Sequence, residues 1–208
     1  MKKTIIAVGI MLALPFVAFA APQIQPLPPN IFEWVQSSAR SGYWFNKQEM
    51  YYGIKNGVID KNLLTVPVMK VYDDVQINEV ITKRRWHDAS LQGYEILAGA
   101  AEYLEFNLKA REVTIKRHED LDNTWTTLSS EMPNRRVYLD KLSDKNVDKI
   151  FYIAILEYAD KHKEEILERS LKKGKLPEVK TEVKKDKKNK NDKKDKKERN
   201  STKVKNDR

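Results

Sequence analysis

The chain has 208 residues, no cysteine and a formal net charge of +9. Without cysteine it can have no disulfide framework, thiolate metal site, lipid-modified cysteine or cysteine nucleophile. The basic excess is confined to one end. The last 34 residues, from Lys175, hold 15 of the 39 Lys and Arg but 7 of the 30 Asp and Glu, a net charge of +8, whereas residues 21–174 carry −1. The body is therefore not a basic protein, and we expect no specific nucleic-acid recognition.

The first 20 residues predict export. Lys2 and Lys3 form a positive start, the stretch from Ile5 to Phe19 is apolar, and the Ala-Phe-Ala ending at Ala20 has the small-x-small pattern of a signal-peptidase site. The apolar run is shorter than the roughly 20 residues of a membrane span, and an uncleaved anchor is the alternative. We expect a signal peptide over residues 1–20, no transmembrane segment after cleavage, and a periplasmic, cell-surface or secreted product.

Composition divides the remainder into three parts. Residues 21–29 include four prolines, which predicts an extended spacer, with a proline-rich-motif ligand as the alternative. Residues 30–173, roughly 140 in number, have the size of one domain with one core. Residues 174–208 contain four aliphatic side chains and no aromatic one, so we expect a disordered Lys-rich tail.

The first half of the domain shows short, mixed signals. Residues 30–40 suggest a short helix or an approach segment, and Tyr43 to Phe45 suggest a strand. Asn56-Gly57 predicts a tight turn that pairs residues 50–54 with the next segment of the chain. Residues 63–72 predict a strand in which Pro67 indicates an edge position or a bulge. Asp73 or Asp74 then caps a helix that ends in a cluster of cations at residues 83–85.

The second half carries the clearest β pattern. Apolar residues alternate with polar ones on both sides of a turn at Lys109-Ala110, which predicts an antiparallel hairpin. Residues 120–123 predict a second turn before a strand over residues 125–128, and Ser143 is the expected N-cap of a long last helix. These elements indicate an α+β fold: a small antiparallel sheet packed against a long C-terminal helix, followed by the disordered basic tail.

Three segments also suggest a family. They are Gly42-Tyr43-Trp44-Phe45-Asn46, Glu102-Tyr103-Leu104-Glu105-Phe106-Asn107 and Asp122-Asn123-Thr124-Trp125. Their order resembles that of the surface-adhesin-E-like domains, which are small exported envelope proteins of bacteria. The resemblance implies an envelope-associated, non-catalytic, β-rich domain, and it transfers no binding residue to this chain.

Few residues suggest catalysis or metal binding. The three histidines, His87, His118 and His162, lack the short spacing of a metal site, and residues 118–122 are interpreted as a solvated turn. We therefore expect no metal site, no catalytic residue and no cofactor. Arg84, Arg85 and Trp86 could form a ligand patch, but a helix end with a buried Trp is the favoured interpretation. Carboxylate pairs leave no sequence motif, so whether the chain is an enzyme stays open.

The tail suggests a physical function. Its flexible cations could adhere to anionic polymers, or the tail could be a plain spacer. We predict an exported envelope protein that is a non-enzymatic binding or structural module, with anionic envelope polymers or envelope proteins as partners. The alternative is a secreted hydrolase with an unrecognised carboxylate site. The residues expected to bind polyanions are Lys184, Lys185, Lys187, Lys188, Lys190, Lys193, Lys194, Lys196, Lys197 and Arg199.

Overall fold

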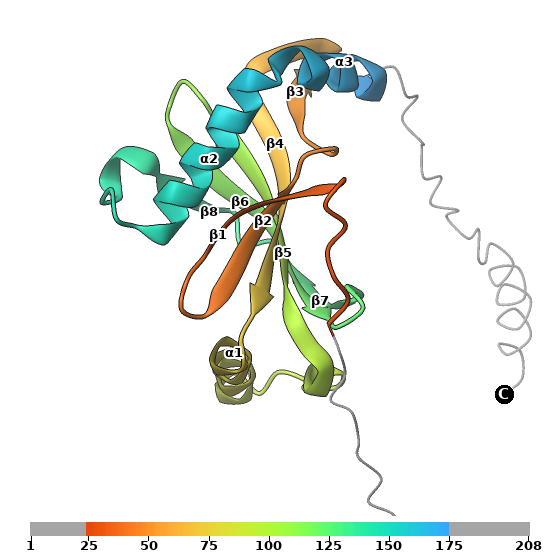
Figure 1. The fold of residues 1–208 in the computed structure, drawn as a ribbon, viewed down its shortest axis with the longest axis vertical. Coiled ribbons are helices and arrows are strands. Elements are labelled where there is room, and N and C mark those ends of the chain that lie inside the picture. Colours follow the sequence, from red (N-terminus) through yellow and green to blue (C-terminus); the bar gives the residue numbers. More distant parts are fainter. Residues whose placement is uncertain (1–23, 175–208) are drawn as a thin grey trace, which may run out of the picture. The chain divides into compact units, whose positions relative to one another are not determined.

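A computed structural model describes residues 24–174, which form an antiparallel sheet with helices at both ends (Figure 1). The strand order is β1-β2-β4-β5-β6-β7, with β3 also paired to β4 and β8 also paired to β6. The strands are β1 (Phe32–Ser37), β2 (Ser41–Asn46), β3 (Tyr51–Lys55), β4 (Val58–Tyr72), β5 (Leu97–Asn107), β6 (Glu112–Asp122), β7 (Thr127–Glu131) and β8 (Arg135–Tyr138). The helices are α1 (Asp74–Trp86), α2 (Val147–Lys161) and α3 (Lys163–Gly174), with 3₁₀ turns η1 (Tyr94–Ile96) and η2 (Leu139–Lys141).

The predicted α+β class and antiparallel pairing are confirmed, but two details are wrong. The sheet is not small, because eight strands join it. The long last helix is two shorter ones of 15 and 12 residues that meet at His162, whose φ of −113° interrupts the helical path. The first of them is capped by Asn146, whose side chain accepts a hydrogen bond from the Lys149 amide, rather than by Ser143.

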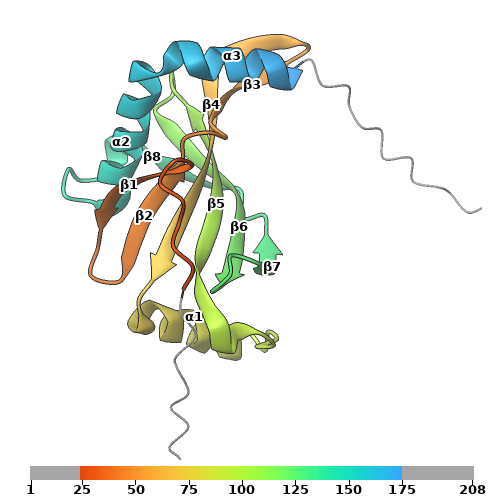
Figure 2. The same cartoon turned by 45° about the vertical axis from the view of Figure 1, so that its right-hand side comes forward.

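The main core lies between the sheet and the last two helices. One side of β4, β5 and β6 presents alternating apolar residues, and α2 adds Phe151, Tyr152 and Ile155, all at most 1% exposed. Helix α3 is joined to β3 through the buried Ser170, whose hydroxyl accepts from the Tyr52 amide at 2.8 Å and donates to the Ile166 carbonyl at 2.6 Å. Figures 1 and 2 show α2 and α3 at one end of the sheet and α1 at the other. We call the side of the sheet that packs against α2 and α3 the helix-side face.

The opposite side, the open face, has a smaller apolar cluster. Its buried members are Met69, Ala101 and Leu121, with Trp44 and Trp125 packed against them. The chain before β1 is bonded to this region: the Gln25 amide donates to the Asn123 carbonyl and the Trp125 indole donates to the Gln25 carbonyl, both at 3.0 Å. Residues 24–29 belong to the predicted spacer.

Several local predictions fail for identifiable reasons. Residues 32–37 are the edge strand β1 rather than a helix, because β2 supplies a pairing partner along their length. Pro67 lies inside the central strand β4, at the point where pairing with β3 has ended at Thr65 and pairing with β2 begins at Val68. Its missing N–H therefore falls where that side of β4 has no partner. Trp125 lies in the turn before β7 with φ of +67°, not in the strand.

Other predictions are confirmed. Asp73 caps α1, accepting from the Gln76 amide at 2.7 Å. Asn56 and Gly57 join β3 to β4 with φ values of +53° and +76°, which matches the positive φ that both central residues of a type I′ turn adopt. The predicted hairpin is β5 and β6, in register from Leu104 opposite Ile115 to Asn107 opposite Glu112.

Candidate functional site

The predicted ligand patch is split by the orientation of its side chains. The Arg84 side chain points toward η1. Its guanidinium donates to the Ser90 carbonyl at 2.9 and 3.0 Å and lies 4.1 Å from the centre of the Tyr94 ring. Arg85 and Trp86 face outward, and Trp86 is 79% exposed. The prediction that a helix ends at these residues is confirmed, and the prediction that Trp86 is buried is wrong. The ten residues predicted to bind polyanions lie outside the described residues.

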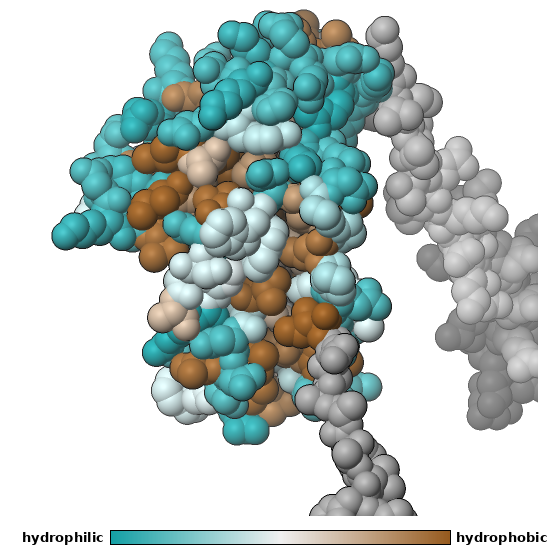
Figure 3. Space-filling view, in the orientation of Figure 1, coloured by the Kyte–Doolittle hydropathy of each residue, from teal (hydrophilic) through white to brown (hydrophobic). Residues whose placement is uncertain are grey.

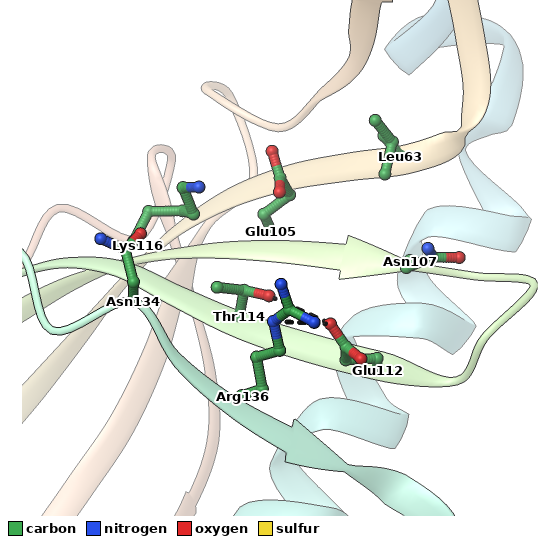
Figure 4. A pocket seen from close by; sticks show the side chains of 8 residues that line it. All are labelled: Leu63, Glu105, Asn107, Glu112, Thr114, Lys116, Asn134 and Arg136. Carbon is green, nitrogen blue, oxygen red and sulfur yellow. Dashed lines mark hydrogen bonds and ion pairs between the residues drawn. The ribbon is translucent and has the colours of Figure 1, made fainter.

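A polar groove crosses the open face where β5, β6 and β8 run side by side (Figure 4). Its volume is about 430 Å³, and its lining includes Glu105, Glu112, Lys116 and Arg136. Arg136 Nε lies 3.6 Å from Glu112 Oε1, while the side chains of Glu105 and Lys116 form no ion pair or hydrogen bond within residues 24–174. The groove thus offers one unpaired carboxylate and one unpaired ammonium among polar side chains.

A β-bulge places one of these charges. The register of β5 with β6 shifts between Tyr103, which faces Arg117, and Leu104, which faces Ile115. Lys116 is the extra residue of this bulge, and bulges re-aim side chains in this way beside binding sites. The same shift changes which residues of β6 point to the helix-side face, so that Val113 and Ile115 are followed there by His118 and Asp120.

These two residues belong to a buried polar cluster on the helix-side face. We call it the polar cluster, and its members are Lys70, Tyr94, Glu102, His118, Asp120, Ser129 and the inward-turned Arg84. His118 is opposite Glu102 in the β5–β6 register, and Asp120 lies two residues further along β6 on the same side. Two of the residues expected to form a solvated turn, His118 and Asp120, therefore line a buried site within strand β6, which corrects that prediction.

The imidazole of His118 is held between two carboxylates. Nδ1 lies 3.3 Å from Glu102 Oε1 and Nε2 lies 3.2 Å from Asp120 Oδ1. Lys70 Nζ lies 2.8 Å from the other oxygen of Glu102, so that oxygen is satisfied by an ion pair. The Tyr94 hydroxyl donates to Asp120 Oδ2 at 2.6 Å, and the Ser129 hydroxyl donates to the same oxygen at 3.1 Å. Every charge in the cluster thus has an opposite charge beside it.

This geometry sets the protonation states. Burial alone would lower the pKa of His118, but its hydrogen bonds to Asp120 and Glu102 raise that pKa to about 9. Burial opposes ionisation of Glu102, yet the His118 hydrogen bond and the Lys70 charge hold its pKa at about 2. The pKa of Asp120 is lowered despite its burial, chiefly by hydrogen bonds from His118 and Tyr94. Burial, reinforced by the bond to Asp120, raises the pKa of Tyr94 to about 12.

At neutral pH the cluster therefore contains an imidazolium with both N–H groups already donated, two carboxylates, an ammonium, the Arg84 guanidinium and a neutral tyrosine. A general base needs a free lone pair near the operating pH, and His118 offers none in this state. The arrangement instead binds β4, β5, β6, β7, η1 and α1 together electrostatically. Within residues 24–174, no group of three His, Asp or Glu side chains has the geometry to hold a metal ion.

The sequence contained one usable signal for this site. Glu102 occupies the same phase of the β5 alternation as the buried Leu104 and Phe106, and a charged residue in a buried phase requires a partner. His118 gave no such signal, because the bulge at Lys116 breaks the phase of β6.

Comparisons with protein-family models, curated proteins and solved structures give no match to this chain. The resemblance to surface-adhesin-E-like domains thus stays a prediction. In the part of the chain that the structure describes, no helix has the length and apolarity needed to cross a bilayer.

Proposed function

We propose that this chain is an exported envelope or surface protein that acts without catalysis, as a binding or structural module attached to anionic polymers by its Lys-rich C-terminal segment. The observation that carries the proposal is the separation of charge. Residues 175–208 have a net charge of +8, whereas residues 21–174 have −1. An anionic polymer would therefore be attracted to the C-terminal segment and not to the domain.

The contacts of the domain support this division. Ten of its 22 Lys and Arg form ion pairs with its own carboxylates, including the buried Lys70 and the inward-turned Arg84. A surface whose cations face acidic neighbours has a weak long-range field. The C-terminal segment instead has 15 cations for 7 acids, and its polyanion contacts should be loose and salt-sensitive.

The open face is the surface through which the domain would meet a partner. The last two helices cover the other side of the sheet, while the groove of Figure 4 presents Glu105, Lys116 and Arg136 toward solvent. Because the groove mixes both signs of charge, it suits a polar partner such as an envelope protein or a hydroxyl-rich polymer. The hydrolase alternative has one observation in its favour, which is that Glu105 and Glu112 line the same groove.

Binding to polyphosphate, followed by salt titration, tests the proposal. The mature chain should bind at about 50 mM salt and lose at least about tenfold in affinity by 200 mM, because counterion release drives such contacts. Protein truncated after Gly174 should not bind. A full-length control in which the ten predicted polyanion-binding residues are replaced by Gln keeps the segment's length and should also fail to bind.

Equal binding by the truncated protein, or binding that persists at high salt, would show that the C-terminal segment is only a spacer. A hydrolase would shorten an envelope polysaccharide during the same incubation, which size-exclusion chromatography of the polymer would reveal.

A further inference from the structure

A cavity of about 510 Å³ lies between α1, η1 and the start of the described chain. Five of its ten lining residues are aliphatic: Ile77 and Ile81 from α1, Ile96 from η1, Leu97 from β5, and Ile24. Figure 3 shows hydrophobic surface next to the point where the described chain begins. Small-molecule sites are typically cavities of several hundred Å³ in which apolar walls are combined with placed polar groups.

The cavity exists because α1 does not fill it. Helix α1 has no fully buried residue, unlike α2, which buries Phe151, Tyr152, Ile155 and Ala159. Its isoleucines, Ile77 and Ile81, line the cavity and remain partly exposed, so apolar surface is left open to solvent or to a ligand.

The charges at the mouth all have one sign. Asp74, in the first turn of α1, and Glu95, in η1, line the cavity, and among residues 24–174 no Lys, Arg or His contributes to the lining. The side-chain carboxylates of Asp74 and Glu95 form no ion pair or hydrogen bond within residues 24–174. Asn78 and Asn123 complete the polar part of the lining. The mouth therefore complements a positive charge.

The walls are held in place before any ligand binds. Tyr94 is 3% exposed and is fixed by its hydrogen bond to Asp120 and by the Arg84 guanidinium, 4.1 Å from its ring centre. On the opposite wall, Ile24 is followed directly by Gln25, whose amide and carbonyl are both bonded to the turn around Asn123 and Trp125. Preformed walls reduce the ordering cost of binding.

We propose that this cavity binds a small amphiphile with an aliphatic body and a cationic head, such as a primary amine. The aliphatic part would replace solvent against the isoleucines, and the ammonium would lie at the mouth beside Asp74 and Glu95. This site is independent of the C-terminal segment, so it can be tested whether or not the polyanion proposal holds.

Three probes of equal chain length separate the two contributions. Isothermal titration of the full mature chain with octylamine, octanol and octanoate at pH 7 should rank them in that order of affinity. At this pH the amine is protonated and the acid is ionised. Two exposed carboxylates should give octylamine an advantage of about fivefold to tenfold over octanol.

Variants then locate the site. The pair Asp74→Asn and Glu95→Gln should remove the advantage of octylamine and leave octanol unchanged. The matched control, Glu157→Gln with Asp160→Asn on the exposed side of α2, removes the same charge elsewhere and should keep the ranking. Ile77→Trp should fill the cavity and weaken all three probes at least about fivefold.

Three results would overturn the proposal: octylamine binding no more tightly than octanoate, the charge variant behaving as the wild type, or a folded Ile77→Trp protein binding all probes unchanged. The charge variant alters only exposed side chains, so it decides the matter even if Ile77→Trp does not fold.

Discussion

The helix-side face of the sheet has two halves, built from the same strands with opposite chemistry. Beneath α2 and α3, strands β4, β5 and β6 contribute Leu64, Leu104, Phe106 and Ile115, none more than 1% exposed. Toward α1, the same strands contribute Lys70, Glu102, His118 and Asp120. The apolar half is stabilised by removing hydrocarbon from water, and the polar half by complementary charges.

The two halves should therefore respond differently to mutation and to pH. Hydrophobic burial needs no particular protonation state, so the apolar half should be equally stable across the neutral and mildly alkaline range. The polar half should lose stability when His118 becomes neutral, because a neutral imidazole can donate to one of its two carboxylates and not to both. Three changes test this difference.

The largest effect is expected in the apolar half. Phe106 is 1% exposed and its ring meets that of Tyr152 edge-on, with 5.8 Å between the ring centres. Phe106→Ala should lower the free energy of unfolding by about 3–5 kcal/mol, because it removes buried surface and leaves a cavity. Urea unfolding should give the same loss at pH 6 and at pH 9. Leu108→Ala, just beyond the same strand at a 37% exposed position, is the control and should cost far less. A loss for Phe106→Ala that changes with pH would break the comparison.

The second effect concerns pH and the polar half. The folded-state pKa of His118, about 9, lies above its ordinary value of 6.5. Its stabilising contribution is therefore complete below about pH 6.5 and is lost as the pH rises through 9. This difference in pKa corresponds to up to about 3 kcal/mol. The lowered pKa values of Glu102 and Asp120 place their titration below this window.

The measurement is urea unfolding at steps from pH 6 to pH 9.5. The wild-type free energy of unfolding should decline across this range, and His118→Asn should be less stable at pH 6 with a flatter dependence. His87→Asn, which alters an exposed residue just beyond α1, should retain the wild-type slope. An unchanged slope in His118→Asn would assign the pH dependence to another group.

The same contrast explains what could be predicted from sequence. The alternation of Leu104 and Phe106 with polar neighbours predicts the hairpin and its buried side, because burial acts on each residue by its own polarity. The polar cluster depends on which charged residues become neighbours. Which residues become neighbours is set by the registers of β4 with β5, β5 with β6 and β6 with β7, and by the bulge at Lys116. None of these features has a local sequence signature.

Helix orientation and helix continuity account for two other predictions that were wrong, the burial of Trp86 and the single long last helix. Trp86 follows three cations on a helix, and the sequence could not show that α1 would direct Arg84 inward and Trp86 outward. The break at His162 was hidden because the apolar stripe of α2 is followed without a Gly or Pro by helix-forming residues of α3.

The smallest expected effect tests how far the polar cluster depends on a single hydroxyl group, that of Ser129, which also accepts from Tyr94 at 2.8 Å and from Arg84 at 3.4 Å. The Ser129 hydroxyl donates to Asp120 Oδ2 at 3.1 Å, an oxygen that also accepts from Tyr94 at 2.6 Å, while His118 holds the other oxygen. Ser129→Ala removes one of three donors and should lower the free energy of unfolding by about 1 kcal/mol. The control is Ser130→Ala. The exposed Ser130 hydroxyl lies 3.5 Å from Glu119 Oε1, so its removal should change the free energy of unfolding by less than about 0.5 kcal/mol.

The pH profile of Ser129→Ala distinguishes a shared network from separate pairs. Because both carboxylates remain next to His118 in this variant, the decline in stability between pH 6.5 and 9 should keep the wild-type slope. A flattened slope would mean that Ser129 fixes the position of Asp120 relative to the imidazole. The polar half would then act as a single unit, and the His118 contribution would depend on a residue that does not touch the ring.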